Sequence, residues 1–252
     1  MIQGLPWKTA WITGASTGIG REIALQMAQA GVEVAASSRS AGSLAGLHPK
    51  IHPYPLDVTD AKATVETVAQ IERERGPIDL ALFAAAYYQP VDPAALDPAV
   101  FERTLSTNVM GVVNGIAAVL PRLQQRQAGH LAWFASVAGY RGLPKAAAYG
   151  PSKAALINLA ESLKPDLAGM GIKVSVVNPG FVETPLTAQN DFPMPFLMKP
   201  DAAARLTIDG LARERFEISY PWQFVSLLKI ARILPYGLYF RMIDRMMKKP
   251  LT

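Results

Sequence analysis

The chain has 252 residues, of which 50% are hydrophobic and 18% charged, a balance that excludes a disordered or fibrous protein and indicates one compact domain. It has no cysteine, so disulfides, thiolate metal sites and a cysteine nucleophile are excluded. The net charge of +5 lies entirely in residues 222–252, which hold six basic side chains and one acidic one, and the neutral remainder offers no basic face to nucleic acid.

Strand-like and helix-like segments alternate along most of the chain. The strand-like runs are short and almost continuously apolar, as expected for strands covered on both faces, and helical spacing follows most of them. The pattern predicts a Rossmann-like α/β fold, a doubly wound parallel sheet in one catalytic domain over 1–221. The expected strands are 9–13, 32–37, 50–56, 78–84, 130–135 and 173–177, and the expected helices are 19–30, 61–75, 99–124, 147–169 and 201–214.

A glycine-rich turn joins the first expected strand to the first expected helix. It reads Thr13-Gly14-Ala15-Ser16-Thr17-Gly18-Ile19-Gly20. Glycines let the backbone approach a pyrophosphate closely, and a helix start offers unpaired amide hydrogens and the positive end of its dipole to phosphate. The spacing is G-x-x-x-G-x-G, and a plain tight turn would also use glycine. The position between strand and helix favours a nucleotide site.

Tyr149 and Lys153 lie four residues apart in the helix expected over 147–169, with Ser136 a short loop upstream. Side chains at i and i+4 share one helix face, so the ammonium can stand beside the phenol. A nearby cation favours phenolate and lowers the tyrosine pKa from near ~10 toward the range of a general acid or base. Taken alone, the two side chains would also fit an exposed helical pair.

Together, the glycine-rich turn, Ser136 and the Tyr149/Lys153 pair resemble the classical short-chain dehydrogenase/reductase family over about residues 8–185. The resemblance implies hydride transfer between nicotinamide C4 and a carbonyl or carbinol carbon. A second interpretation is a catalytically silent nucleotide sensor or scaffold on the same fold. Such proteins usually lack the tyrosine or the lysine, so the presence of both favours the enzyme.

The resemblance implies a role for each of four catalytic residues. Tyr149 would give or take the oxygen-bound proton, and Ser136 would position the substrate oxygen. Lys153 would bind the nicotinamide ribose and lower the pKa of Tyr149, while Asn108 would anchor a water that links Lys153 to solvent. The implied cofactor contacts are Gly14, Ser16, Thr17, Gly18, Ile19, Gly20, Ser38, Arg39, Asp57, Val58, Ala84, Ala85, Tyr149, Lys153, Pro179, Gly180, Val182 and Thr184.

The end of the second expected strand bears on the choice of cofactor. An NAD enzyme usually places an acid there to bind the 2′-hydroxyl of the adenosine ribose. Here Ser38 takes that position, and Arg39 offers a guanidinium to a 2′-phosphate. The sequence therefore favours NADP(H) over NAD(H), while a solvated loop charge is the other interpretation of Arg39.

One stretch departs from the family pattern. The family usually has Asn-Asn-Ala-Gly after the fourth strand, and this chain has Phe83-Ala84-Ala85-Ala86. Because the family's asparagine ties neighbouring strands together, we expect altered packing beneath the adenosine rather than lost chemistry. We therefore expect this departure to affect the affinity for the cofactor.

Residues 185–217 correspond to the region that covers the substrate in the family. Their Phe, Met and Leu side chains either line a site for an apolar carbonyl or alcohol, lipid-derived compounds included, or pack the loop onto the body. The resemblance also implies a homo-oligomer, either a dimer or a tetramer. The histidines show no ligand-like spacing, so we expect no metal, and without a secretion signal we expect a cytoplasmic protein.

Residues 222–252 form a basic amphipathic extension of the same domain. Two expected helices, 223–234 and one after Pro235-Tyr236-Gly237, carry Lys and Arg on one side and apolar side chains on the other. Neither is long enough to span a bilayer. The extension fits either a hairpin on the anionic inner face of a membrane or a helical segment that packs on its own domain or a second copy.

Overall fold

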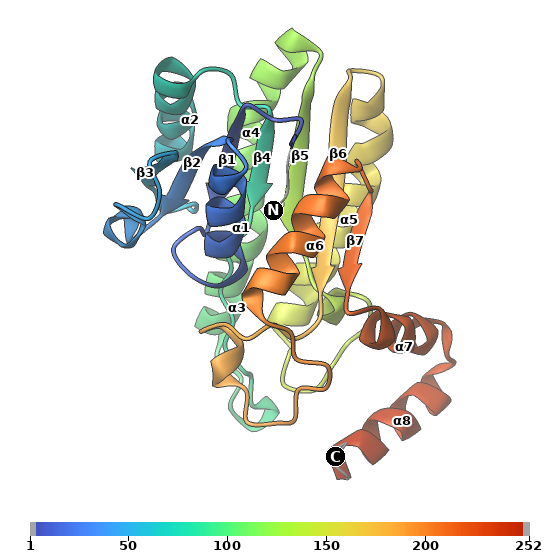
Figure 1. Ribbon diagram of the computed structural model, residues 1–252. Coiled ribbons are helices and arrows are strands. Elements are labelled where there is room, and N and C mark those ends of the chain that lie inside the picture. The colour runs from blue at the N-terminus through green and yellow to red at the C-terminus, as the bar shows by residue number, and fades with distance from the viewer. Residues whose placement is uncertain (1–3, 249–252) are drawn as a thin grey trace.

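The computed structural model describes residues 4–248, which form a sheet of seven parallel strands covered by helices on both faces (Figure 1). The strand order is β3-β2-β1-β4-β5-β6-β7, which confirms the predicted doubly wound sheet. Residues 249–252 of the expected C-terminal extension lie outside the described residues.

The strands are β1 (Thr9–Thr13), β2 (Glu33–Ser38), β3 (Ile51–Pro55), β4 (Leu80–Phe83), β5 (Gly129–Phe134), β6 (Ile172–Pro179) and β7 (Glu217–Tyr220). The helices are α1 (Gly18–Gln29), α2 (Ala61–Arg75), α3 (Pro98–Leu105), α4 (Gly111–Arg126), α5 (Tyr149–Ala168), α6 (Pro200–Ala212), α7 (Trp222–Ile233) and α8 (Tyr236–Lys248). Short helical turns are η1 (Ala41–Leu44), η2 (Pro93–Ala95), the π-helical η3 (Ser106–Met110), η4 (Val137–Gly139) and η5 (Thr187–Gln189).

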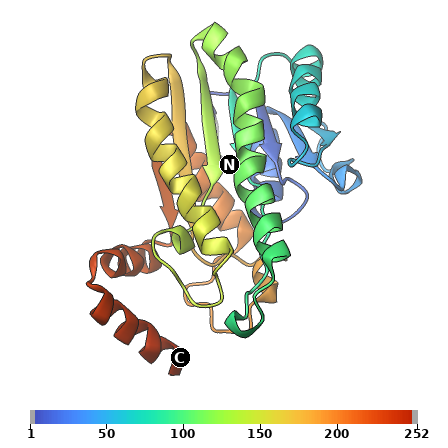
Figure 2. The same ribbon diagram turned by 180° about the vertical axis from the view of Figure 1, so that it is seen from behind.

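Each central strand sends alternate side chains to the two faces of the sheet, so the sheet has a core on both sides. One core, which includes Trp11 and Trp133, lies under α2, α4 and α5. The other, which includes Ile12 and Leu82, lies under α1 and α6. Figure 1 shows α1 and α6 on the near face, and Figure 2 shows α4 and α5, in green and yellow, on the other. Burial on both faces explains why these strands are apolar along their whole length.

The structure differs from the sequence prediction in three elements. β7 was not predicted, because only Ile218 and Tyr220 of its four residues are buried and it pairs only with β6. The helix expected over 99–124 is α3, the π turn η3 and α4 in succession. In the predicted substrate region, 185–217, α6 is a core helix that packs on α1, so only 185–199 forms a loop over the carboxyl edge of the sheet.

One helical run in the described chain, Pro98–Arg126, has the length and hydropathy of a candidate membrane span. Its second part, α4, buries Val112, Ile116 and Val119 in the core under the sheet. The composition of this run is therefore explained by its place in the core.

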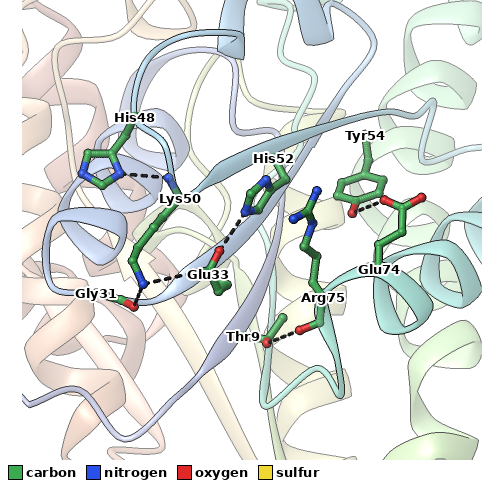
Figure 3. A network of polar contacts seen from close by, with 9 residues as sticks. All are labelled: Thr9, Gly31, Glu33, His48, Lys50, His52, Tyr54, Glu74 and Arg75. Carbon is green, nitrogen blue, oxygen red and sulfur yellow. Dashed lines mark hydrogen bonds and ion pairs between the residues drawn. The ribbon is translucent and has the colours of Figure 1, made fainter.

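A polar network fastens the amino ends of β2 and β3 at the edge of the sheet (Figure 3). The carboxylate of Glu33 faces His52 Nε2 at 2.8 Å and accepts a hydrogen bond from Lys50 Nζ at 2.9 Å. These two bonds hold the pKa of Glu33 below its usual value. Further along the strand, the Tyr54 hydroxyl donates to Glu74 on α2 at 2.9 Å. The network lies at the opposite end of the strands from the cavities described below, so its role is structural.

His130, on β5, is a titratable group buried in the core. Its Nε2 lies 2.8 Å from Ser175 Oγ, and that hydroxyl donates to the Arg215 carbonyl at 2.6 Å. Because the serine has a single hydrogen to donate, Nε2–H of His130 is the donor to it. Burial lowers the pKa of His130 from 6.5 to about 4.

We expect the free energy of unfolding to fall as the pH drops below 6.5, because the unfolded chain then binds a proton that folded His130 accepts only near pH 4. The loss is ~1.4 kcal/mol per pH unit, or roughly 2 kcal/mol down to about pH 5. His130→Gln keeps a donor and does not titrate, so urea unfolding should show a smaller pH dependence in this variant. Equal pH dependence in the variant and the parent protein would contradict the assignment.

Candidate active site

The carboxyl ends of the strands open into a cavity of about 690 Å³. Every residue that the sequence predicted to contact a cofactor lines this cavity. Three of the four predicted catalytic residues, Ser136, Tyr149 and Lys153, line it as well, whereas Asn108 is buried behind its wall. The residues described by the structure contain no group of three or more His, Asp and Glu side chains that could hold a metal ion.

One end of this cavity has the shape and polarity that a pyrophosphate needs. Gly14 has a φ of +69°, and a Cβ on it would lie 2.4 Å from the Ala85 nitrogen, so only glycine fits. At the start of α1 the residue in the capping position, Thr17, makes no side-chain cap. The first amides of α1 are therefore left without a side-chain partner where the helix dipole is positive. This end of the cavity fits an anionic phosphate group.

The carboxyl end of β2 carries polar groups that the protein itself leaves unsatisfied. Ser38 Oγ is buried and has no hydrogen-bond partner, which is uncommon for a buried hydroxyl. Next to it, Arg39 is exposed and forms no ion pair within the described part of the chain. On the adjacent strand end, after β3, hydrogen bonds from the Thr59 backbone and side chain lower the pKa of Asp57, and the positive charge of Arg39 lowers it further. A phosphate group would satisfy both Ser38 and Arg39.

The stretch Phe83-Ala84-Ala85-Ala86 is packed as part of the sheet edge. Phe83 lies edge-on against Trp11, with ring centroids 5.4 Å apart, in space left free by Gly115. The Ala84 amide donates to the Thr13 carbonyl at 3.2 Å, which ties β4 to β1 through the backbone alone. The three alanines line the cavity. The strands are thus connected without the asparagine that the family pattern would place here.

Lys153 has the most unusual environment of the site. Its side chain is 1% exposed, and Nζ donates a hydrogen bond of 2.8 Å to the Phe134 carbonyl at the end of β5. Nζ also lies 5.3 Å from the centroid of the Tyr149 ring, as expected for residues four apart on α5. Burial lowers the pKa of Lys153 from 10.5 to about 7.

The pKa of Tyr149 shifts in the opposite direction to the one expected. Burial raises this pKa above its ordinary value, and a hydrogen bond with Ser136 lowers it by less. The expected lowering by Lys153 is wrong for this structure, because the loss of solvent around the phenol outweighs the hydrogen bond with Ser136. Tyr149 is therefore fully protonated at neutral pH.

Asn108 connects two segments of the site from behind. Its side-chain oxygen accepts from the Tyr87 amide at 2.7 Å, and its nitrogen donates to the Tyr87 carbonyl and to Ser152 Oγ, each at 3.0 Å. Ser152 in turn donates to the Tyr149 carbonyl at 2.7 Å. Asn108 thereby fixes the first turn of α5, which carries Tyr149. The water relay expected at Asn108 stays a prediction.

A second cavity of about 250 Å³ meets the first one at Ser136, Tyr149 and Gly180. Its walls are largely apolar and come from the loop before α5, from the segment after β6, and from α7 and α8. Near its polar side, Lys145 forms an ion pair of 2.7 Å with Asp191, which joins the first two of these segments. The lining residues include Leu143, Phe181, Phe192, Pro193, Pro195, Phe224, Leu228 and Ile243.

For the apolar side chains of residues 185–217 the sequence left two positions open, the wall of a site or packing on the body, and both occur. Phe192 lines the second cavity, whereas Met198 bonds through its backbone to Phe181 and packs on the body. Phe196 is half exposed.

The sequence prediction missed Tyr88 and the C-terminal part of the second cavity. The Tyr88 ring stands edge-on to Tyr149 with centroids 5.1 Å apart, and its hydroxyl donates to Asn190 at 3.0 Å. In the sequence, the only indication that Tyr88 belongs to the site is its position shortly after the alanine stretch. The contribution of Phe224, Leu228 and Ile243 to this cavity depends on long-range folding and leaves no local pattern.

Residues 8–193 match the family model for short chain dehydrogenase. An uncharacterised oxidoreductase of Myxococcus xanthus is 39% identical over 242 residues, covering 93% of this chain and 96% of the relative. A short-chain dehydrogenase from Streptomyces avermitilis superposes with a TM-score of 0.80 at 23% identity, over 96% of each chain. The structure of ElxO with NADP bound gives a TM-score of 0.74 at 24% identity, over 84% of this chain and 97% of that one.

Proposed function

The chain belongs to the short-chain dehydrogenase family of oxidoreductases, and we propose that it is an NADP(H)-dependent enzyme for an apolar ketone or aldehyde, or the matching alcohol. The observation that carries this proposal is the position of Tyr149. It lies where a cavity fitted to a dinucleotide meets a smaller apolar cavity, with Ser136 and Lys153 beside it. An apolar carbonyl compound, including one derived from a lipid, suits the smaller cavity.

The cofactor supplies or accepts the hydride when it is bound. Ser136 Oγ accepts a hydrogen bond from the Ala138 amide at 3.1 Å, and this fixes the hydroxyl beside Tyr149. From there Ser136 can hold a substrate oxygen in line with the phenol. Because burial keeps the proton on Tyr149 at neutral pH, Tyr149 can donate it to that oxygen.

Lys153 supports proton transfer by Tyr149. With a pKa of about 7, its amine can both bind and release a proton near neutral pH. Its position within the cofactor-sized cavity also suits a hydrogen bond to a ribose hydroxyl. The neighbouring Asn108 and Ser152 are assigned to positioning, since they hold the first turn of α5 from behind.

The choice of NADP(H) rests on two groups at the end of β2. Ser38 has a buried hydroxyl without a partner, and Arg39 has an exposed guanidinium that forms no close ion pair in the described residues, with the carboxylate of Asp57 at longer range. The fold neighbour ElxO, which binds NADP by its description, supports the same choice. No acid stands at Ser38 to repel a 2′-phosphate.

The place of the enzyme in the cell and its assembly are also proposals. We place it in the cytoplasm, as a dimer or tetramer, on the basis of the sequence and of the resemblance to the family.

We expect Arg39→Gln to lower kcat/KM for NADPH by roughly ten- to hundredfold, since a hydrogen bond to a charged group contributes ~1.5–3 kcal/mol. The value for NADH should stay unchanged, because NADH has no 2′-phosphate for Arg39 to bind. Steady-state kinetics with both cofactors measure this, and Arg73→Gln, on the exposed side of α2, is the matched control. Equal losses with the two cofactors would contradict the assignment of Arg39.

We expect Tyr149→Phe to bind NADPH normally and to lose turnover by on the order of a thousandfold, because the phenol proton is gone. NADPH absorbance measured against a panel of apolar ketones and aldehydes tests this, with the exposed Tyr236→Phe as the control. If the parent protein binds NADPH and turns over nothing in the panel, the catalytically silent sensor becomes the better interpretation.

A further inference from the structure

The hairpin of α7 and α8 is apolar on two opposite sides. Its inner side includes Phe224 and Leu228, which line the smaller cavity. On its outer side Ile230, Ile233, Tyr236 and Phe240 are 58%, 81%, 73% and 57% exposed. We call these four residues the apolar tip. A helix at the surface of a domain normally turns a polar side to water, so an outer side of this kind indicates a surface that meets a partner.

The apolar tip lies at the turn between the two helices. Figures 1 and 2 both show the hairpin projecting past the carboxyl ends of the strands, with this turn on the side away from the body. Tyr236 and Phe240 stack on each other with ring centroids 6.0 Å apart. Trp222 and Leu227, also exposed, extend the apolar surface along α7. The patch is therefore presented outward.

Contacts from the loop before α5 fasten the hairpin in this position. The Arg141 guanidinium donates to the carbonyls of Ala231 and Leu234 at the end of α7, the second at 2.7 Å. It also lies 4.0 Å from the centroid of the Tyr239 ring, whose hydroxyl donates to the Gly142 carbonyl. Arg141 also lies 4.9 Å from the centroid of the Tyr236 ring, so it contacts one residue of the apolar tip, yet all four tip residues stay more than half exposed.

Positive charge adjoins the apolar tip along the chain, where Arg232 precedes Ile233 and Arg241 follows Phe240. Arg232, Arg241 and Arg245 are exposed and form no ion pair within residues 4–248, while Lys229 is paired with Glu217. Asp244 is the one acid in 222–252, and this segment carries the whole net charge of the chain. Exposed aromatic and aliphatic side chains next to arginines are typical of helices that lie at the surface of a membrane.

We propose that the apolar tip inserts into the headgroup region of an anionic lipid bilayer, with the three arginines on anionic headgroups. The competing occupant is a second copy of this chain. In a two-fold dimer the same patch faces itself, so the unpaired arginines of one copy would meet those of the other. Charge complementarity therefore favours the lipid surface.

Docking of this kind brings the smaller cavity close to the lipid. The inner side of the same helices forms part of its wall, so docking would place the cavity and the bilayer on either side of one helical hairpin. If the proposed function holds, an apolar substrate dissolved in the membrane has a short path to Tyr149.

Sedimentation of the full chain with phospholipid vesicles tests the proposal. We expect binding to vesicles of phosphatidylcholine with phosphatidylglycerol, weaker binding at high salt, and little binding to phosphatidylcholine alone. The variant Ile230→Ser/Ile233→Ser should bind on the order of thirtyfold more weakly. The matched control, Val65→Ser/Leu206→Ser, removes two exposed apolar side chains elsewhere and should bind like the parent protein.

Three outcomes would overturn the proposal: no binding to either vesicle, equal binding by the isoleucine variant, and a solution dimer that this variant dissociates. The last outcome would assign the patch to a second copy. Thermal unfolding and NADPH binding check that the variant is folded. Its turnover of a water-soluble carbonyl should match the parent protein, which separates a failure of docking from a failure of catalysis.

Discussion

A buried lysine without a counter-ion in the described part of the chain constrains how the carboxyl edge of this sheet is built. Lys153 is almost fully buried, and within the described residues its hydrogen-bond partner is the Phe134 carbonyl. Burying a charge without an opposite charge is costly, so the pKa of this amine falls. The hydrogen bond requires β5 to end with the Phe134 carbonyl facing α5. It also requires α5 to begin at Tyr149, so that Lys153, four residues later, lies on the buried side of the helix.

The surrounding segments keep that arrangement in place. η4 packs directly on α5, where a Cβ on Gly139 would lie 2.7 Å from the Lys153 carbonyl carbon, so the two backbones touch. This contact places Ser136, just before η4, beside Tyr149. From the other side, Asn108 and Ser152 hold the first turn of α5. Acid–base chemistry at Tyr149 therefore depends on backbone packing as much as on the residues that face the cavity.

The sequence predicts the parts of the site that depend on local structure. The glycine-rich turn follows β1 directly and Ser38 ends β2, and the parallel sheet brings these strand ends to one edge. The pKa of Tyr149 could not be predicted, because its sign depends on how deeply the fold buries the phenol. β7 is too short and too polar to show a strand pattern. The two apolar sides of α7 look alike in sequence, and only the structure shows that Phe224 and Leu228 face a cavity while Ile230 faces outward.

Titration of Lys153 in the protein without cofactor tests the central claim most directly, because burial of this amine is what orders the site. Carbon-13 NMR of protein labelled at the lysine ε-carbons follows each amine separately, and Lys153→Met identifies the signal. The account predicts a midpoint of about 7 for Lys153. A midpoint near the ordinary lysine value of 10.5 would show a solvated amine and contradict the account.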